Sequence, residues 1–271
     1  MSSISRQISL GFLKTPPLWT RKQFGIDQFV IPDIDPGRIK EFSFPSKMRL
    51  GHKMEFVFNA IIESQNVYKL IAKNIVVQKG KTTLGELDFL LRSISDGSLI
   101  HLELTYKFYL IDTEISEPIY QLVGPNRRDM FYTKLDKLKE HQFSLPFTKE
   151  GIETLHERGL EPEPLKQQAC FKAQLFTPFK NTKVSIRPLN KSCICGFWIR
   201  FEELNSEPFK DFQYYIPLKE EWILNPYEEA DWINLFNLLL EINIRMLKES
   251  SPMVWMRKSE GVYAKFFVVW W

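Results

Sequence analysis

The chain has 271 residues, of which 44% are hydrophobic and 25% charged, and its formal net charge is +3. This composition predicts a globular protein with a sizeable core and excludes disordered, collagenous and low-complexity classes. The small net charge does not by itself indicate a nucleic-acid partner. The three cysteines, Cys170, Cys193 and Cys195, are too few for a disulfide framework, and Cys193 and Cys195 lack the second ligand pair of a structural zinc site.

No apolar run approaches the ~18 residues of a membrane span, and no apolar stretch near the N-terminus precedes a small-residue cleavage site. We therefore expect a soluble, cytoplasmic protein without a membrane partner. Residues 1–45 contain five prolines and show no sustained period, which predicts an arm of short turns. Basic residues outnumber acidic ones by nine to four over residues 1–53.

The expected core starts with a helix over residues 46–65, where apolar residues recur at helical spacing after a cap at Ser46. Three strands are expected next, over 68–78, 84–91 and 99–111, and short turns join them. Short turns make consecutive strands antiparallel neighbours. A second helix is expected after Gly124 and Pro125, with Asn126 as its N-cap.

Further elements are expected towards the C-terminus. A short helix is predicted around 149–158, and a strand over 167–178 can join the first sheet. Residues 196–204, 211–218 and 262–271 are strand-like. A helix over 227–248 is predicted to bury one face, made of Trp232, Phe236, Leu239, Ile242 and Met246.

These elements predict an α/β (α+β) fold in three parts. The parts are an N-terminal arm (1–45), a core (46–180) and a C-terminal α+β extension (181–271). No phosphate-binding loop, nucleophile elbow or dinucleotide fingerprint occurs in the sequence.

Two adjacent strands of the expected core each carry acidic residues within an apolar run. Strict alternation would place Glu86 and Asp88 on one face of the first strand, with Leu84 and Leu90, and Gly85, Leu87, Phe89 and Leu91 on the other. In the next strand, His101, Glu103, Thr105 and Lys107 would share a face.

Asp88 and Glu103 are therefore expected to lie close together. Burying an unpaired carboxylate costs several kcal/mol, and a second acid nearby raises that cost unless a cation lies between them. Two acids with Lys107 nearby are the parts of a hard-metal site. The alternative is an internal salt bridge of Lys107 with Asp88 or Glu103 on a half-polar sheet face.

The blocks GELDFLL, HLELTYKFYL and GPNRRDMFYTKLDKLKEHQ resemble the PD-(D/E)XK nuclease superfamily. They resemble more closely a bacterial family of unknown function that is assigned to that superfamily. The resemblance is best over residues 48–142. It implies a restriction-endonuclease-like α-β-β-β-α core with a mixed central sheet. It also implies a metal-dependent endo- or exonuclease that hydrolyses phosphodiester bonds, with DNA favoured over RNA.

The resemblance also assigns roles to individual residues. Asp88 occupies the position of the superfamily's first metal-binding aspartate, and Glu103 occupies the position of its second acid. Glu55 occupies the position of the helical glutamate that many members add. Together with the main-chain carbonyl of Leu104, these residues are implied to hold Mg²⁺ or Mn²⁺. The superfamily's lysine is implied to polarise the attacking water or to stabilise the charge of the phosphorane.

Two positions depart from the superfamily pattern. Leu87 replaces the proline before the aspartate, and Thr105 stands at the usual lysine position. Lys107 lies two strand steps, ~6.6 Å, beyond Glu103 on the same face, a distance that a lysine stem spans. Lys107 is therefore the predicted catalytic lysine. The threonine at position 105 is equally consistent with a second interpretation, in which the chain is a non-catalytic module that recognises nucleic acid or protein.

Other polar residues have weaker expected roles. Lys134, Lys137 and His141 fall on one face of the second helix, and Gln142 follows them. The resemblance implies that this set contacts phosphate, and a solvated charged face is the alternative. His101 is either a third metal ligand or a hydrogen-bonded core residue.

Overall fold

A computed structural model describes residues 3–45, 47–162 and 164–271. The chain forms two compact units, the first made of Met1–Tyr106 with Thr133–Lys172 and the second of Lys107–Tyr132 with Ala173–Trp271. Strands β5 (Leu99–Ile111) and β7 (Leu165–Pro178) contribute their first parts to the first unit and their last parts to the second. The units thus do not follow the boundaries expected at residues 45 and 180.

The first unit contains a sheet in the strand order β3-β4-β5-β7. Strands β3 (Tyr68–Lys79), β4 (Thr82–Ser93) and β5 are antiparallel neighbours, which confirms the expected meander. Strand β7 joins this sheet, as expected. Two short strands complete the unit: β2 (Ile26–Gln28) pairs parallel with β7, and β1 (Lys22–Gln23) pairs antiparallel with β2.

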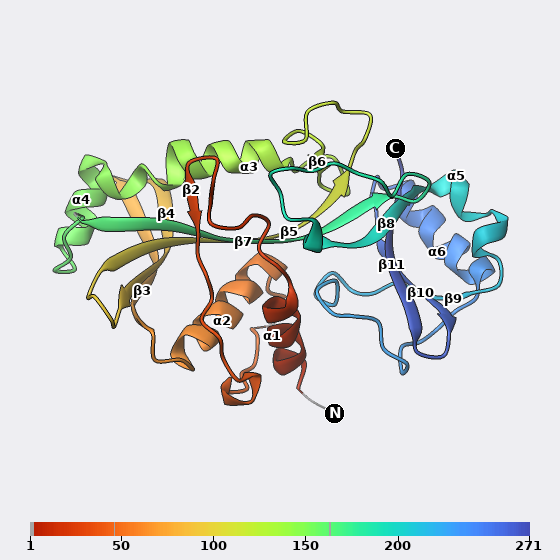
Figure 1. The fold of residues 1–271 in the computed structure, drawn as a ribbon, viewed down its shortest axis with the longest axis horizontal. Coiled ribbons are helices and arrows are strands. Elements are labelled where there is room, and N and C mark those ends of the chain that lie inside the picture. Colours follow the sequence, from red (N-terminus) through yellow and green to blue (C-terminus); the bar gives the residue numbers. More distant parts are fainter. Residues whose placement is uncertain (1–2, 46, 163) are drawn as a thin grey trace. The chain divides into compact units, whose positions relative to one another are not determined.

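Helices cover both faces of this sheet (Figure 1). Helices α1 (Ile4–Lys14) and α2 (Leu50–Glu63) lie on one side, where the rings of Phe58 and Phe89 have centroids 4.8 Å apart. Helices α3 (Phe131–Lys137) and α4 (Lys149–His156) lie on the other. A π-helical turn (Leu138–Gln142) and a 3₁₀ turn (Leu145–Phe147) join these two helices. The fold is therefore mixed α/β, as expected at this level.

Several expected helix boundaries in the first unit were wrong. The arm of turns contains α1, which the sequence conceals because its buried face combines only Ile8 and Phe12 with two serines. Helix α2 has Arg49 as its N-cap residue, and the predicted cap Ser46 lies outside the described residues.

The expected helix after Asn126 also begins later than predicted. Helix α3 starts at Phe131. The side chain of Asn126 does not cap it and instead accepts a hydrogen bond from the main-chain N–H of Ser251 at 2.8 Å. A bond to a distant segment thus replaces the local bond that the sequence suggests.

The second unit contains a mixed sheet in the order β7-β8-β11-β10-β9. Strand β8 (Ile194–Arg200) is parallel to both β7 and β11 (Val262–Val269). Strands β10 (Met253–Ser259) and β9 (Gln213–Tyr215) continue it with antiparallel pairs. Strand β10 was not predicted. The short strand β6 (Leu122–Val123) pairs with β5, and helix α5 (Phe201–Leu204) follows β8.

Helix α6 (Leu235–Met246) is shorter than the helix expected over 227–248. The side chain of Asn234 caps it by accepting a hydrogen bond from the main-chain N–H of Asn237 at 2.9 Å. Leu238 and Ile242 are buried in the core of the second unit, but Phe236 is 68% exposed. The expectation that Phe236 lies on the buried face was therefore wrong, because the apolar residues of α6 occupy two faces and only one is covered.

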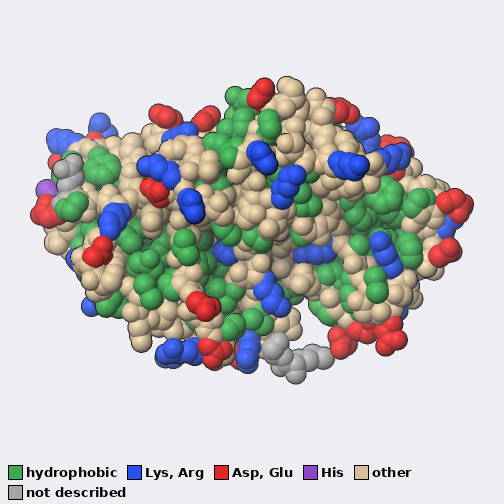
Figure 2. Space-filling view, viewed as in Figure 1, with side chains coloured by type: hydrophobic (Ala, Val, Ile, Leu, Met, Phe, Trp, Pro, Cys, Tyr) green, Lys and Arg blue, Asp and Glu red, His purple; other side chains and the backbone are tan. Residues whose placement is uncertain are grey.

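On the face shown in Figure 2, Lys and Arg side chains are interspersed with Asp and Glu, and hydrophobic side chains reach the surface in several places. This face therefore presents charge of both signs. Among the described residues, no helix is both long enough and apolar enough to cross a membrane.

Candidate active site

The candidate site lies where the pairing of β4 and β5 ends. Among the described residues, direct pairs of these strands run from Arg92 with Leu99 to Phe89 with Leu102. Strand β4 pairs with β3 over a longer stretch, down to Thr82. The main-chain ladder between β4 and β5 thus stops one residue before Asp88 and one residue before Glu103.

The two acidic side chains bridge the strands at this point. The Oδ2 atom of Asp88 accepts a hydrogen bond from the main-chain N–H of Leu104 at 2.8 Å. The Oε1 atom of Glu103 accepts one from the main-chain N–H of Asp88 at 3.4 Å. Both carboxylates therefore lie in the gap between the strands, and the expectation that Asp88 and Glu103 occupy adjacent strands is confirmed.

The expected alternation of side chains along β4 was wrong at this same point. Leu87 and Leu90 are three residues apart, yet both pack in the cluster that contains Leu145 and Leu155. Phe89, which should share a face with Leu87, packs on α2 instead.

The partner strand explains this change of face. Asn74 stands opposite Asp88, between the pairs of Lys73 with Phe89 and of Ile75 with Leu87. Its φ of 52° is in the left-handed region, which asparagine adopts more readily than most residues. The alternation is interrupted on both strands at this position, which leaves Asp88 directed towards β5.

Glu103 is held in one orientation by neighbouring side chains. It is 2% exposed, and its Oε2 atom accepts a hydrogen bond from Gln142 at 2.7 Å. Its Oε1 atom lies 2.8 Å from Nε2 of His101. The amide of Gln167 donates to Nδ1 of His101 at 3.4 Å and to the carbonyl of Phe143 at 2.6 Å. Because Nδ1 accepts, Nε2 carries the proton and donates to Glu103.

These contacts decide between the two roles considered for His101. The residue is fully buried, and both ring nitrogens are used in hydrogen bonds. His101 is therefore a core residue that orients Glu103. The sequence offered no local signal for Gln167, which comes from β7, more than 60 residues along the chain.

The electrostatics of the site disfavour two ionised acids. The pKa of Asp88 is raised to about 8, chiefly by burial and also by the charges of Glu103 and Glu55. The hydrogen bond from Leu104 and the charge of Lys134 oppose this rise. With this pKa, Asp88 is mostly protonated near neutral pH, and a cation placed beside it would favour its ionised form.

Glu55 reaches the site from α2. Its Oε1 atom lies 3.1 Å from Nδ1 of His52, and its Oε2 atom accepts a hydrogen bond from the side chain of Asn74 at 3.0 Å. Asn74 is the residue opposite Asp88, so this bond fixes Glu55 near the point where the alternation changes. Its contribution to the pKa of Asp88 places its charge within electrostatic range of that carboxyl.

The oxygen atoms at the site fit a hard divalent cation. Asp88 and Glu103 bring two carboxylates together here. Mg²⁺ typically binds one or two carboxylates, keeps several waters and uses substrate phosphate, so this small set suits Mg²⁺ or Mn²⁺. Within the described ranges, no three His, Cys, Asp or Glu residues are grouped so that they alone could hold a metal ion.

The predicted lysine, Lys107, forms an ion pair with an acid other than Asp88 or Glu103. The Nζ atom of Lys107 lies 2.5 Å from Oδ2 of Asp129 in the second unit. Among the described residues, Lys107 forms an ion pair with Asp129 alone. The alternative considered above, an ion pair of Lys107 with Asp88 or Glu103, is not formed. Thr105, at the usual lysine position, is 4% exposed.

The residues expected to contact phosphate separate into two groups. Lys134 is partly buried and acts electrostatically on Asp88, and Gln142 donates to Glu103 and, at 3.3 Å, to the carbonyl of Glu86. Lys137 and His141 are exposed to solvent. The structure thus brings Lys134 and Gln142 to the two acids, and Gln142 serves there as a donor to Glu103.

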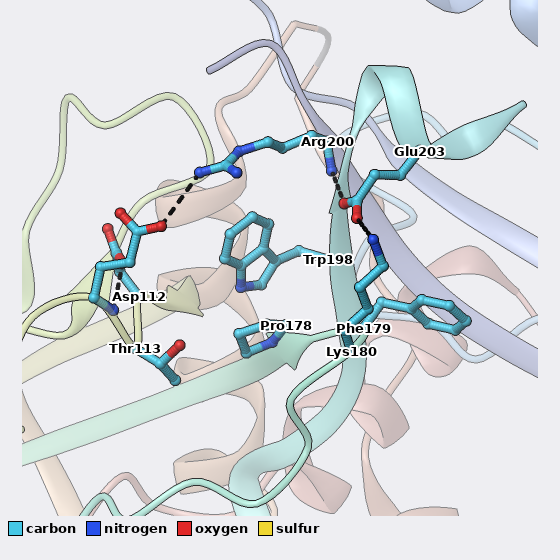
Figure 3. Close-up of a pocket in the computed structure, with 9 residues that line it drawn as sticks. Asp112, Thr113, Pro178, Phe179, Lys180, Trp198, Arg200 and Glu203 are labelled. Carbon is cyan, nitrogen blue, oxygen red and sulfur yellow. Dashed lines mark hydrogen bonds and ion pairs between the residues drawn. The ribbon is translucent and has the colours of Figure 1, made fainter. Parts of the chain in front are cut away.

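The second unit contains a separate cavity of about 150 Å³, shown in Figure 3. The Nε1 atom of Trp198, one of its lining residues, donates to the carbonyl of Ile111 at 3.1 Å. Charged lining side chains pair with one another: Lys180 with Glu203 at 2.7 Å, and Arg200 with Glu114 at 3.5 Å. The charges of these four lining side chains thus offset one another in two ion pairs.

Comparison with known proteins gives one match. A family model described as a domain of unknown function (DUF1853) matches residues 33–267. No curated protein and no solved structure matches the chain. The matched range includes Glu55, Asp88, Glu103 and the residues that contact them.

Proposed function

The chain belongs to the family described as a domain of unknown function (DUF1853), and we propose that it is a metal-dependent nuclease that hydrolyses phosphodiester bonds, with DNA favoured over RNA. In this proposal, the helices and strands of the first unit form a restriction-endonuclease-like core of the PD-(D/E)XK type. The mixed α/β architecture supports this assignment, as does the order α2-β3-β4-β5, which the short strand β6 and then α3 follow.

The observation that carries the proposal is the meeting of Asp88 and Glu103 where the ladder ends. Two acids are in contact with each other's strands, and one of them has a pKa raised to about 8, so the site disfavours two negative charges without a counter-ion. Such a pair is costly in a purely structural role, because each ionised acid disfavours the other. A bound divalent cation would offset that cost.

The proposal assigns a role to each neighbouring residue. Asp88, Glu103 and the carbonyl of Leu104 would hold Mg²⁺ or Mn²⁺. When bound, the ion would supply Lewis acidity and a more acidic water. Glu55 would orient the ligands from α2, and Lys134 would contact the phosphate of the substrate.

A second function is favoured by a different observation. Thr105 is buried at the usual lysine position, and the ammonium of Lys107 is paired with Asp129. This arrangement favours a non-catalytic module that binds nucleic acid or protein on a nuclease-like fold. A lysine that assists the attacking water would have to leave Asp129, or its task would fall to Lys134.

A cleavage panel tests the first proposal. Supercoiled plasmid, single- and double-stranded DNA oligonucleotides and an RNA oligonucleotide are incubated with the full chain in Mg²⁺, Mn²⁺ or chelator. Cleavage is expected with metal and is expected to be lost in Asp88→Asn and Glu103→Gln. The matched control is Asp136→Asn, which removes an exposed carboxylate on α3 and should cleave like the wild type.

Mn²⁺ titration by calorimetry completes the test. The wild type and Asp136→Asn are expected to bind Mn²⁺, whereas Asp88→Asn is expected to bind at least ~10-fold more weakly, because one of only two carboxylate ligands is lost. Equal Mn²⁺ binding in wild type and Asp88→Asn, with no cleavage of any substrate, would refute the nuclease. Binding of nucleic acid that is the same in both proteins and needs no metal would support the second function.

A further inference from the structure

The segment that joins the ends of β7 and β8 in the second unit carries positive charge without acidic neighbours (Figure 1). From 164 to 201 the sequence contains seven lysines and arginines and no aspartate or glutamate. Acidic residues make up 33 of the 271 residues, about one in eight, so a stretch of this length would ordinarily contain several. We call residues 179–193 the β7–β8 loop.

The loop is folded so that its cations reach solvent. Val184 and Ile186 are buried, whereas Lys183 and Arg187, on either side of them, are exposed. Leu189 is also buried, and its main-chain N–H donates to the carbonyl of Ile186 at 2.7 Å. Apolar side chains thus anchor the loop in the second unit and leave the charged ones on its outer side.

The cations in the middle of the loop are not used in ion pairs. Lys180, at its start, pairs with Glu203 at 2.7 Å. Among the described residues, Lys183, Arg187 and Lys191 form no ion pair. These three follow one another at intervals of four residues, so at most ~14 Å separates each from the next. Three charges without a counter-ion therefore lie on one short segment, which favours an anionic partner.

The other exposed residues of the loop indicate which kind of anion it fits. They are short polar residues and one proline: Asn181, Thr182, Ser185, Pro188 and Ser192. Lysine, arginine and short polar side chains are the groups that contact the phosphate oxygens of nucleic acids. The core of a protein interface is enriched in aromatic residues, and a membrane-surface helix needs an apolar face. Between residues 180 and 192, all of which the structure describes, Pro188 is the sole exposed apolar residue.

The same residues favour a duplex over a single strand. Proteins that bind single strands stack the bases on aromatic side chains in addition to neutralising the phosphates. Residues 180–192 include no aromatic residue. A duplex keeps its bases stacked inside and presents one negative charge per ~1.7 Å of its axis, so it needs only cations and hydrogen-bond donors from the protein.

We propose that the β7–β8 loop binds the phosphate backbone of double-stranded DNA, independently of sequence, through Lys183, Arg187 and Lys191. The choice of DNA among polyanions rests on the function proposed above. The loop belongs entirely to the second unit and contains none of the residues placed at the two acids.

Fluorescence anisotropy with a short labelled DNA duplex, in chelator so that nothing is cleaved, tests the proposal. The triple variant Lys183→Gln/Arg187→Gln/Lys191→Gln removes three phosphate contacts. The slope of log K against log salt, between about 50 and 200 mM, should become shallower by ~2.7, which is ~0.9 per contact. The dissociation constant should rise on the order of 10-fold, and equally for duplexes of unrelated sequence.

A second triple variant provides the matched control. Lys219→Gln/Lys248→Gln/Lys258→Gln changes three exposed lysines of the same unit outside the loop. Both triple variants lower the formal net charge from +3 to 0, so an effect of overall charge would appear in both. The control should bind the duplex like the wild type. Thermal melts followed by circular dichroism should show that both variants are folded.

Three results would overturn the proposal. They are a loop variant with the wild-type affinity and salt slope, equal losses in the two triple variants, and a wild type that binds anionic phosphatidylglycerol vesicles but no duplex. The nuclease is judged separately. Binding of duplex DNA through the loop without cleavage of any substrate would refute the nuclease and support the role of the loop. Cleavage by a loop variant that binds DNA like the wild type would do the reverse.

Discussion

Asp88 accepts a hydrogen bond from the residue after Glu103, and Glu103 accepts one from the main chain of Asp88. The two acids therefore replace main-chain pairing where β4 and β5 separate. Each carboxylate satisfies a donor of the neighbouring strand, which gives both acids a local structural role. Burial, and after it the charge of Glu103, nevertheless raises the pKa of Asp88.

The raised pKa of Asp88 predicts how the stability of the metal-free protein depends on pH. The folded-state pKa of about 8 exceeds the unfolded value of 3.8, so the folded protein binds more protons between these values. The free energy of unfolding should therefore fall as pH rises from about 4 to about 8. Asp88→Asn removes this loss and should be more stable than the wild type at about pH 8 by on the order of a few kcal/mol.

Urea unfolding at a series of pH values, with chelator present, measures this difference. The gap between Asp88→Asn and wild type should widen steadily with pH. Asp136→Asn, which changes an exposed carboxylate, should track the wild type. A constant gap between Asp88→Asn and wild type would show that Asp88 is ionised throughout.

His101 is predicted to be the main donor that stabilises buried Glu103. His101→Ala should lower the free energy of unfolding by ~2–4 kcal/mol, because it leaves a buried carboxylate with one donor fewer. Gln167→Ala should cost less, about 1 kcal/mol, because it breaks only neutral hydrogen bonds. Equilibrium unfolding in urea measures both effects, and a larger loss in Gln167→Ala than in His101→Ala would contradict this order.

The protein is predicted to tolerate truncation of the Gln142 side chain better than its conversion to an acid. Gln142→Ala loses one hydrogen bond to a charged group and should cost ~1.5–3 kcal/mol. Gln142→Glu places a third carboxylate against Glu103 and should be more destabilising still at neutral pH. Lowering the pH should reduce the deficit of Gln142→Glu but not that of Gln142→Ala. Thermal melts of both variants at neutral and acidic pH would reveal the difference, and identical pH profiles would argue against the contact with Glu103.

Lys107 is predicted to contribute little to stability. Its ion pair with Asp129 is partly exposed, at 32% and 41% for the two side chains, and such pairs typically contribute ~0–1 kcal/mol. Lys107→Ala, Asp129→Ala and the double variant should therefore show a small coupling energy in a double-mutant cycle. A loss of several kcal/mol in Lys107→Ala would mean that Lys107 compensates a buried acid. Cleavage lost in Lys107→Ala with an unchanged melt would assign it a catalytic role.

The sequence predicted the strands of the first unit well, because β3 and β5 are rich in β-branched and aromatic residues, β4 is rich in leucine, and short turns separate the three. The same short turns predicted that Asp88 and Glu103 occupy neighbouring strands. Local signals were sufficient here, since the contacts that matter connect segments adjacent in the chain.

Other features depended on contacts that local sequence does not encode. The hydrogen bond of Gln167 to His101 joins β7 to β5, and the ion pair of Lys107 leads to a loop residue, Asp129. The change of face at Asp88 depends on the left-handed conformation of Asn74 on the partner strand. Alternation alone predicts a regular strand, so this interruption was invisible in the sequence.

The interruption at Asn74 has a consequence for folding cooperativity. Phe89 of the β3-β4 hairpin packs against α2, whereas Leu87 and Leu90, which flank the interruption, both pack in the cluster that contains Leu155. One hairpin is thus anchored in both helix layers of the first unit. Detachment of either layer would expose part of the hairpin to solvent, so hydrogen exchange should report the two layers opening together as a single unit.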